Sequence, residues 1–410
     1  MNENIIRIKS SWRSCGLWLK IFCVLCFSAP ALYAADYGAF VQGEFDARGA
    51  DENKTNGSVI AAPWISVPFG ESELYVSAGL NTSISDETYC APELFRLEFS
   101  YQPSSLFSFR LGRFNWQDLS GLVAKGRFDG AELLFDLGKT RLGASMLYTG
   151  LLFKDTADIN ASPADTKDYN VNFDWSDFGN TYFAPRRLMA SLYGEFPGFP
   201  SGRGQLLAGI TAQFDLSDAK EAFHTQYFLL RHVLVYKAFD LDAAGAMELE
   251  KTDANGVKPG FAFSIEGGWQ IPTAIKDRLS LGTAWASGED SGKAAFFPVT
   301  REAQSYVLGP SLSGIMILRA NYAALLLPSL SAELGGSYFI RTDSTSFTMS
   351  YLEDDSYPLG LELDTGLKWV PFSDLSFSLK GGIFLPKTGT AWADDAPVLW
   401  RVTMGTVFSF

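Results

Sequence analysis

The two histidines, His224 and His232, are the first residues to consider for catalysis. Both fall on one predicted strand, eight residues apart, so their side chains share a face. A strand rises about 3.4 Å per residue, which separates them by about 27 Å. They are therefore too far apart to share one site, and no serine can be assigned as the partner of either. We interpret them as ordinary polar residues.

Other catalytic motifs are missing or incomplete. Residues 288–293 (Gly-Glu-Asp-Ser-Gly-Lys) resemble a phosphate-binding loop but are one residue short, and Ala294 replaces the magnesium-coordinating Ser or Thr. There is no HExxH pair, no nucleophile elbow and no EF-hand loop. The sequence predicts no catalytic residue, no metal site and no cofactor, and therefore a protein that is not an enzyme.

Charged residues at alternating positions are the more informative set. In residues 358–369, Leu359, Leu361 and Leu363 alternate with Glu362 and Asp364. Alternation of this kind indicates strands with one apolar and one polar face. We expect the following charges to share the polar face, with acidic side chains outnumbering basic ones: Arg96, Glu98, Arg110, Glu132, Asp136, Arg141, Asp215, Glu266, Glu333, Glu362, Asp364, Lys368, Lys380 and Arg401.

The elements that position these charges are about eighteen alternating segments of roughly ten residues, the length of a tilted membrane-crossing strand. The connections alternate between tight turns, such as 103–105 and 328–329, and long polar stretches. The long ones are 48–57, 85–92, 116–126, 153–185, 217–223, 252–259, 288–305, 342–357 and 386–397. This asymmetry is typical of transmembrane barrels. We predict an all-β fold: a single antiparallel transmembrane β-barrel over residues 35–410, with about 18 strands (16 if one hairpin is misread), short periplasmic turns and long external loops.

Two stretches resemble known barrels. Residues 398–410 form a period-two strand ending in Phe410, which resembles the last strand of bacterial outer-membrane β-barrels of the porin-like kind. That resemblance implies recognition of Phe410 by the barrel assembly machinery. Residues 111–113 and 127–130 (Leu-Gly-Arg and Arg-Phe-Asp-Gly) resemble a strand-loop-strand segment of the eighteen-stranded alginate-export and OprD-like barrels.

The first 34 residues have the features of a cleaved signal peptide: a basic start, a short apolar core and small residues before Asp36. Export of this kind predicts the cell outer membrane as the location. Removal of residues 1–34 leaves 29 basic and 45 acidic residues, a formal charge of −16, because four basic residues and one acidic residue leave with them. So acidic a surface argues against nucleic acid as a partner.

About eighteen strands enclose a bore wide enough for water. We therefore expect a channel for passive diffusion of small polar solutes, favouring cations or neutral solutes. The acidic, aromatic stretch 153–185 is the candidate constriction, with Asp168, Phe173, Asp174, Trp175 and Asp177 as its candidate residues. The alternatives are a surface structural or adhesion barrel that displays acidic loops, and a transporter of hydrophobic solutes.

The apolar face of the strands should contact outer-membrane lipid. We expect the following residues to lie on it: Trp64, Phe99, Phe135, Phe263, Trp269, Trp369, Phe377 and Trp400. The sequence leaves the solute and the oligomeric state open.

Overall fold

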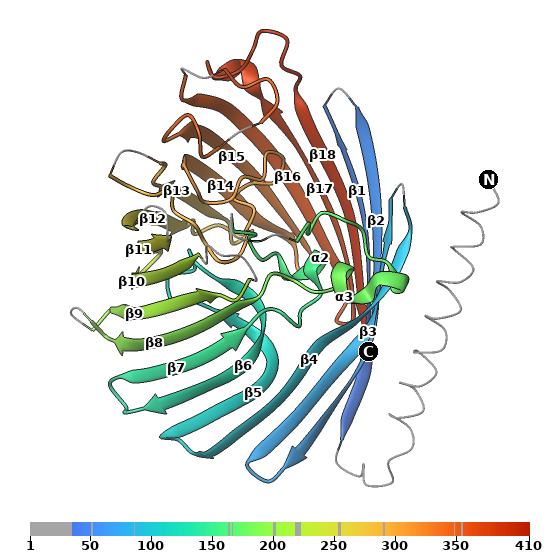
Figure 1. Cartoon of the computed structure of the whole chain (residues 1–410), viewed down its shortest axis with the longest axis vertical. Coiled ribbons are helices and arrows are strands. Elements are labelled where there is room, and N and C mark those ends of the chain that lie inside the picture. The colour runs from blue at the N-terminus through green and yellow to red at the C-terminus, as the bar shows by residue number, and fades with distance from the viewer. Residues whose placement is uncertain are drawn as a thin grey trace, which may run out of the picture.

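The computed structural model describes residues 35–410 except 51, 86, 163–164, 166, 200–201, 218–222, 253–255, 290–291, 348 and 354–355, so the predicted signal peptide lies outside the described residues. Eighteen antiparallel strands form one closed barrel (Figure 1). They are β1 (Asp36–Gly49), β2 (Asn53–Phe69), β3 (Ser72–Ile84), β4 (Tyr89–Ser104), β5 (Phe107–Gln117), β6 (Lys125–Asp136), β7 (Arg141–Tyr148), β8 (Arg187–Pro197), β9 (Gly204–Asp215), β10 (His224–Tyr236), β11 (Phe239–Thr252), β12 (Gly256–Gln270), β13 (Arg278–Ala286), β14 (Ile315–Leu327), β15 (Leu330–Arg341), β16 (Pro358–Phe372), β17 (Leu375–Leu385) and β18 (Leu399–Ser409).

Each strand pairs with its neighbours in sequence, and β18 closes the barrel by pairing with β1. The backbone N–H and C=O groups of Phe410 continue that ladder, because they exchange hydrogen bonds with Ala39 at 3.1 and 3.0 Å. Closure matters physically because a barrel leaves no open edge whose backbone groups would lack partners in a bilayer. The predicted strand number and parity are confirmed.

The connections differ in length at the two ends of the barrel. At one end the hairpins are tight, for example 105–106 and 373–374, whereas the other end carries the long connections 149–186 and 287–314. Two connections predicted to be long, 48–57 and 252–259, are in fact hairpins. In the first, β1 continues to Gly49 and β2 begins at Asn53; in the second, β11 continues to Thr252 and β12 begins at Gly256. Their polar residues belong to strand ends, which sequence polarity alone does not distinguish from loops.

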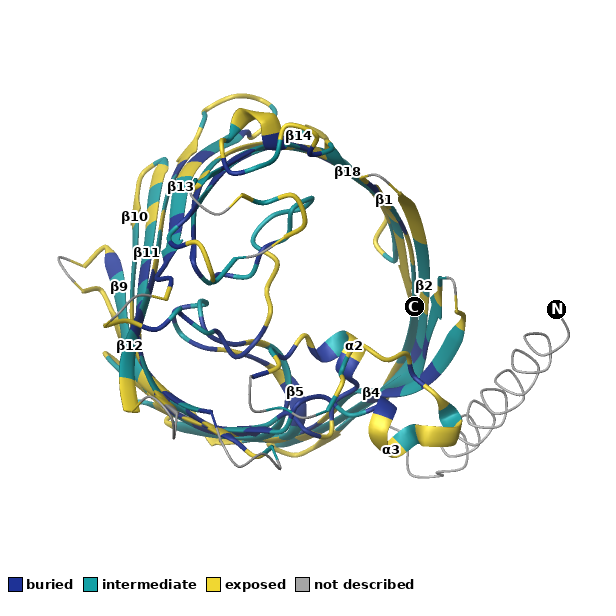
Figure 2. Cartoon of the chain, turned by 45° about the horizontal axis from the view of Figure 1, so that its top comes forward, coloured by how far each residue is buried: buried dark blue, intermediate teal, exposed yellow. Residues whose placement is uncertain are grey.

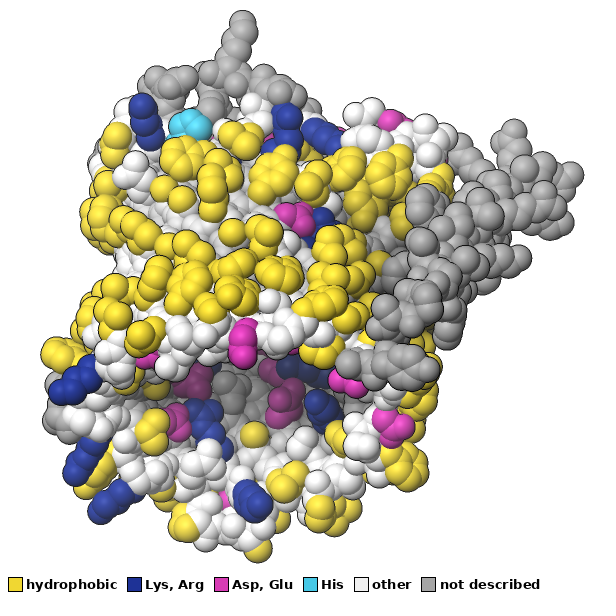
Figure 3. All heavy atoms as spheres, turned by 90° about the horizontal axis from the view of Figure 1, so that it is seen from below, with side chains coloured by type: hydrophobic (Ala, Val, Ile, Leu, Met, Phe, Trp, Pro, Cys, Tyr) yellow, Lys and Arg dark blue, Asp and Glu magenta, His cyan; other side chains and the backbone are white. Residues whose placement is uncertain are grey.

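A band of hydrophobic side chains covers the outer face, and a hollow with acidic and basic side chains opens beside it (Figure 3). Trp269, Trp369 and Phe377 belong to the exposed apolar residues, as predicted. The prediction for Trp64 was wrong. Trp64 faces Gly38 across the β1–β2 pair and stacks on Tyr75 with ring centroids 5.8 Å apart, on the inward face that also carries Arg96.

The wall is incompletely paired at the seam between β4 and β5. Their ladder runs only from Ser104 and Phe107 to Leu97 and Arg113, although β4 continues to Tyr89. Residues 89–96 of β4 therefore have a strand partner on one side only, which is β3. Pro92 lies in this stretch, and proline is tolerated there because the missing N–H faces the unpaired side.

Several loops fold into the barrel, as Figure 2 shows. The connection between β13 and β14, predicted as an external loop over 288–305, lies inside, because its residues bond to lumenal groups such as Glu362 and Val123. The helical pieces are short: α2 (Lys154–Ala157), η1 (Trp175–Asp177), α3 (Phe178–Thr181) and η2 (Pro386–Thr388). In the part of the chain that the structure describes, every helix is too short to cross a membrane.

Candidate functional site

The charges predicted to face inward are mostly ion-paired across the inner wall. Short N···O contacts join Arg96 to Glu98 (2.8 Å), Arg110 to Glu132 (2.6 Å), Arg141 to Asp136 (3.5 Å), Lys380 to Asp364 (3.1 Å) and Glu333 (3.3 Å), and Arg401 to Asp46 (2.6 Å). Glu266 pairs with Arg278 at 3.2 Å. Lys368 is exposed and has no ion pair within the described residues. Alternation thus places these residues on one face, and the strand register brings opposite charges together.

Glu362 faces inward but is fully buried, so it cannot line a pore as the sequence predicted. Its carboxylate accepts hydrogen bonds from the backbone N–H groups of Tyr306, Val307 and Leu308 at 2.8–2.9 Å, and from the Ser305 hydroxyl at 2.9 Å. The residue therefore anchors the β13–β14 loop to the wall.

Three loops meet inside the barrel. The backbone N–H of Val299 donates to Val123 O at 2.8 Å, and on the other side Asn160 N–H donates to Val299 O at 2.9 Å. The N–H of Arg301 donates to Asp158 O at 2.6 Å. Segment 298–301 is thus held between 123–125 and 157–160, and the three together reduce the open cross-section of the lumen.

A buried aspartate shapes the first of these loops. Asp118 accepts hydrogen bonds from the N–H groups of Ser120, Gly121, Val123 and Ala124 at 2.8–3.0 Å. Sequence analysis missed it, although Asp-x-Ser-Gly is the type of pattern in which an aspartate caps its own turn. Asp343 does the same at the loop end of β15, with the N–H groups of Glu289, Thr345 and Ser346 at 2.5–2.7 Å.

Arg187 anchors the second loop. This guanidinium is almost fully buried and bonds Asp165 of the loop and, at 2.7 Å, Asp215 of β9. Asp215 also accepts from the Ser162 hydroxyl at 2.6 Å. Asp215 was predicted to line the pore, but its burial makes it an anchor instead. Arg187 could not be identified as an anchor from the sequence. It directly follows the long polar stretch 153–185, where an arginine looks like another exposed loop residue.

The residues of the 153–185 stretch that were predicted to form the constriction do not lie where the three loops meet. Phe173 is buried with Ala91, Phe153 and Tyr182, and Trp175 and Phe178 pack against this group. We call these six residues the seam cluster. It covers the unpaired side of β4: Trp175 Nε1 donates to Cys90 O at 3.0 Å and Tyr182 Oη to Pro92 O at 2.8 Å.

The predicted acids of that stretch stabilise its local turns. Asp168 accepts from Asn170 N–H at 2.9 Å, Asp174 from Ser176 N–H at 2.8 Å, and Asp177 from the Asn180 amide at 2.8 Å. Helix α3 lies at the rim beside the ring of strands (Figure 2). The lumenal part of this loop is therefore 157–162 rather than 168–177.

Asp158 and Arg301 carry the charge where the loops meet. Asp158 is exposed, yet desolvation by the surrounding loop atoms raises its pKa, and the positive charges of Arg301 and Arg127 oppose that rise. Its backbone is left-handed (φ 49°), a conformation that Asp and Asn tolerate better than most residues. Nearby, Lys125 pairs with Glu302 at 2.6 Å across partly exposed side chains.

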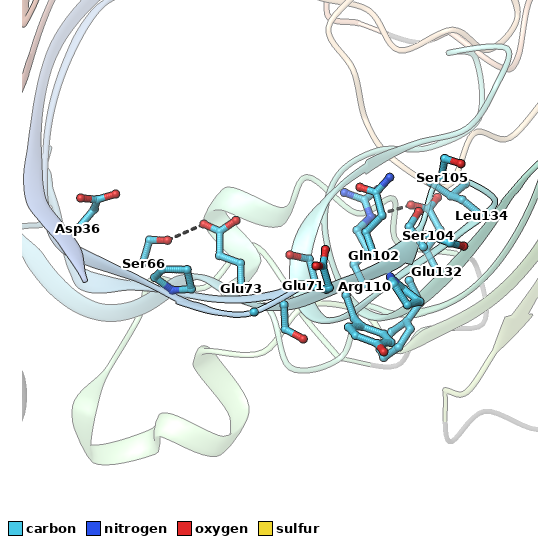
Figure 4. Close-up of a pocket in the computed structure, with 18 residues that line it drawn as sticks. Asp36, Ser66, Glu71, Glu73, Gln102, Ser104, Ser105, Arg110, Glu132 and Leu134 are labelled. Carbon is cyan, nitrogen blue, oxygen red and sulfur yellow. Dashed lines mark hydrogen bonds and ion pairs between the residues drawn. The ribbon is translucent and has the colours of Figure 1, made fainter. Parts of the chain in front are cut away.

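Charged residues of both signs line two of the cavities that adjoin the inner wall. The larger, about 890 Å³, lies at the tight-turn end of β2–β6 and is lined by Asp36, Glu71, Glu73 and the Arg110–Glu132 pair (Figure 4). The smaller, about 290 Å³, lies against β10–β14 and contains Arg231, Arg278 and Arg319 with Asp240, Asp242 and Glu266. Among the described residues, no group of three or more His, Cys, Asp or Glu side chains is arranged to hold a metal ion.

No protein-family model matches this chain, and no curated protein matches it in sequence. Solved structures do match. OpdQ of Pseudomonas aeruginosa superposes with a TM-score of 0.62 at 10% identity over 92% of this chain and 99% of that one. OccK2 (OpdF) in complex with glucuronate gives 0.59 at 14% identity, over 92% and 98%, and OccK8 (OprE) gives 0.59 at 12%, over the same shares, both from the same organism.

These structures belong to the OccK/OprD group of eighteen-stranded outer-membrane porins, which agrees with the resemblance seen in the sequence. Identities this low compare folds only. The chain therefore has the eighteen-stranded barrel fold of the OprD-like porins.

Proposed function

We propose that this protein is an outer-membrane channel through which small polar solutes diffuse passively. The observation that carries the proposal is the combination of a closed eighteen-stranded barrel, an apolar outer band and a charged inner wall narrowed by three interlocked loops. Eighteen strands enclose more space than side chains fill, which leaves room for water. The likeness to porins, among them one crystallised with glucuronate, supports the same function.

We assign the constriction to segments 123–125, 157–162 and 298–301. Anchoring by Asp118, Arg187 and Glu362 supports this assignment, because a constriction that selects solutes must hold its shape. The predicted preference for cations or neutral solutes remains part of the proposal. It is supported by Asp158, an acidic side chain at the meeting point of the loops.

The experiment is electrical. Residues 35–410 are refolded and inserted into a planar bilayer, and the current is recorded under voltage. Discrete steps support the channel, and the reversal potential in a salt gradient gives the ion preference. A clear preference for anions would refute the charge selectivity without refuting the channel. Recognition of Phe410 by the barrel assembly machinery stays a prediction, tested below.

A further inference from the structure

A row of basic residues lies at the tight-turn end of the barrel, on one side only. Four consecutive turns, between β6 and β13, each carry one exposed cation. The remaining tight turns of the barrel carry no Lys or Arg, and two of them carry Glu71 and Asp374. We call the four residues the basic arc: Lys139, Arg203, Lys237 and Lys276. In Figure 3, which looks toward this end, Lys and Arg side chains gather along the lower left edge.

The basic arc has no acidic partner of its own. None of its four side chains forms an ion pair within the described residues. The nearest acids in sequence are occupied: Asp136 contacts Arg141 and accepts from Gly138 N–H at 2.9 Å, and Asp277 accepts from Thr273 and from Tyr322 Oη at 2.9 Å. The positive charge is therefore available to an external anion.

The arc borders the apolar outer band. Strongly exposed hydrophobic side chains stand beside it, among them Leu137, Phe199, Val235 and Phe239. Arg203 and Lys237 flank the ring of Tyr236, at 4.7 and 5.3 Å from its centroid. Aromatic rings next to Lys and Arg mark the level at which a barrel passes from hydrocarbon to lipid headgroups, where long cationic side chains reach outward.

Two of the four cations occupy backbone positions that favour glycine. Lys237 has φ 55° and Lys276 has φ 48°, both in the left-handed region. The Tyr236–Phe239 pair closes a two-residue turn whose first central position usually holds Gly, Asn or Asp. A lysine there carries a conformational cost, and strain of this kind points to a role for the side chain.

We propose that the basic arc binds the phosphate headgroups of anionic phospholipids in the periplasmic leaflet, and so fixes the depth and tilt of this side of the barrel. The inference rests on the proposed membrane location and goes beyond the proposed channel. Each Lys or Arg close to an anionic lipid surface contributes roughly fivefold to the affinity. Because the four cations lie only on the β6–β13 side of the barrel, the contact with anionic lipid is confined to that side.

The test compares full-length mature barrels in vesicles of phosphatidylcholine and in vesicles with an equal amount of phosphatidylglycerol. The arc variant changes all four residues to Gln: K139Q, R203Q, K237Q and K276Q. The matched control removes the same charge at the long-loop end: R48Q, K54Q, K251Q and K387Q, all exposed. Thermal unfolding is followed by the heat-induced shift in gel mobility, at low and high salt.

Wild type and control are expected to unfold several degrees higher in the anionic vesicles, at low salt only, and the arc variant to lose this gain. The proposal would be overturned if the unfolding temperature rose equally in all three proteins, or did not rise in wild type. It would also be overturned if both variants lost the rise equally, since the rise would then depend on net charge and not on the basic arc. If the fourfold variant does not fold, the pair K237G and K276G replaces it, because glycine suits both positions. Conductance of the arc variant in neutral lipid reports on the channel separately.

Discussion

Single buried carboxylates hold the lumenal loops in this barrel. Glu362 and Asp118 each accept four or more hydrogen bonds, mainly from consecutive backbone N–H groups. A buried N–H that loses its acceptor costs about 1–3 kcal/mol. Loops held in this way keep one shape, so their anchors are as important for selectivity as the residues that touch a solute.

Replacing Glu362 with Gln tests this account. The amide nitrogen would face backbone donors, so we expect the segment 305–308 to detach, with a loss of about 2 kcal/mol in unfolding free energy and with noisier, larger single-channel currents. The control is E333Q, which removes an equally charged inward residue that is partly exposed and paired with Lys380. Exposed pairs contribute about 0–1 kcal/mol. Equal behaviour of the two variants would contradict the anchoring role.

Asp158→Asn tests the charge at the constriction. The substitution keeps the tolerated left-handed backbone but removes the negative charge, so the reversal potential in a salt gradient should move toward weaker cation preference. Because desolvation by the loop atoms raises the pKa of Asp158, the cation preference of wild type should weaken on acidification at a higher pH than for an ordinary aspartate. The D158N variant should not show this pH-dependent change in selectivity. D168N, in the same loop but at the rim, should behave as wild type; if it shifts selectivity instead, our placement of the constriction is wrong.

At the scale of elements, the β4–β5 seam shows how a loop can complete a barrel wall. Side-chain donors take the place of a neighbouring strand: Trp175 bonds Cys90 O, Tyr182 bonds Pro92 O, and Arg113 Nη1 bonds Leu94 O at 2.9 Å. The three carbonyls stand at every second residue, the spacing with which a paired strand would have met them. The seam cluster thus has a structural role that its acidic, aromatic composition did not reveal.

The double variant W175F/Y182F removes the two donors and keeps an aromatic ring at both positions. We expect a loss of about 1–3 kcal/mol in unfolding free energy, since the two half-buried carbonyls would lose these hydrogen bonds. Urea unfolding followed by circular dichroism measures it. The control is Y37F, a fully conservative change at an exposed tyrosine. A double variant as stable as Y37F would show that β4 does not depend on the loop.

Phe410→Ala separates closure of the barrel from its assembly. The backbone bonds between residue 410 and Ala39 do not need the aromatic ring, so refolding in detergent should be unchanged. If the ring is the assembly signal, the amount of folded barrel in cells should fall severalfold. Normal yield in cells would remove Phe410 as the signal.

The sequence predicted the elements better than the site, for a physical reason. Strand alternation is local, so the inward position of Arg96, Glu98 and Lys380 could be derived from period two alone. Loop anchoring is not local: Glu362 meets Tyr306 and Ser162 meets Asp215 across more than fifty residues. Polar loop composition indicated exposure, whereas backbone hydrogen bonds to buried anchors allow the same residues to lie inside the lumen.

At the scale of the whole molecule, three features combine: an apolar exterior, a charged interior and loops fixed across the interior. Barrel closure satisfies the strands' backbone groups, and the ion pairs between neighbouring strands distribute charge of both signs around the inner wall. This arrangement is the one that the proposed passive channel needs, because eighteen strands leave space for water beside the fixed loops.

Single-channel conductance of refolded residues 35–410 in a planar bilayer tests that conclusion most directly. We predict stable, discrete current steps in neutral salt, a reversal potential that does not favour anions, and larger, less regular steps in the E362Q variant. A barrel that is shown to be folded by circular dichroism and by its heat-induced gel shift, yet passes no current, would contradict the account.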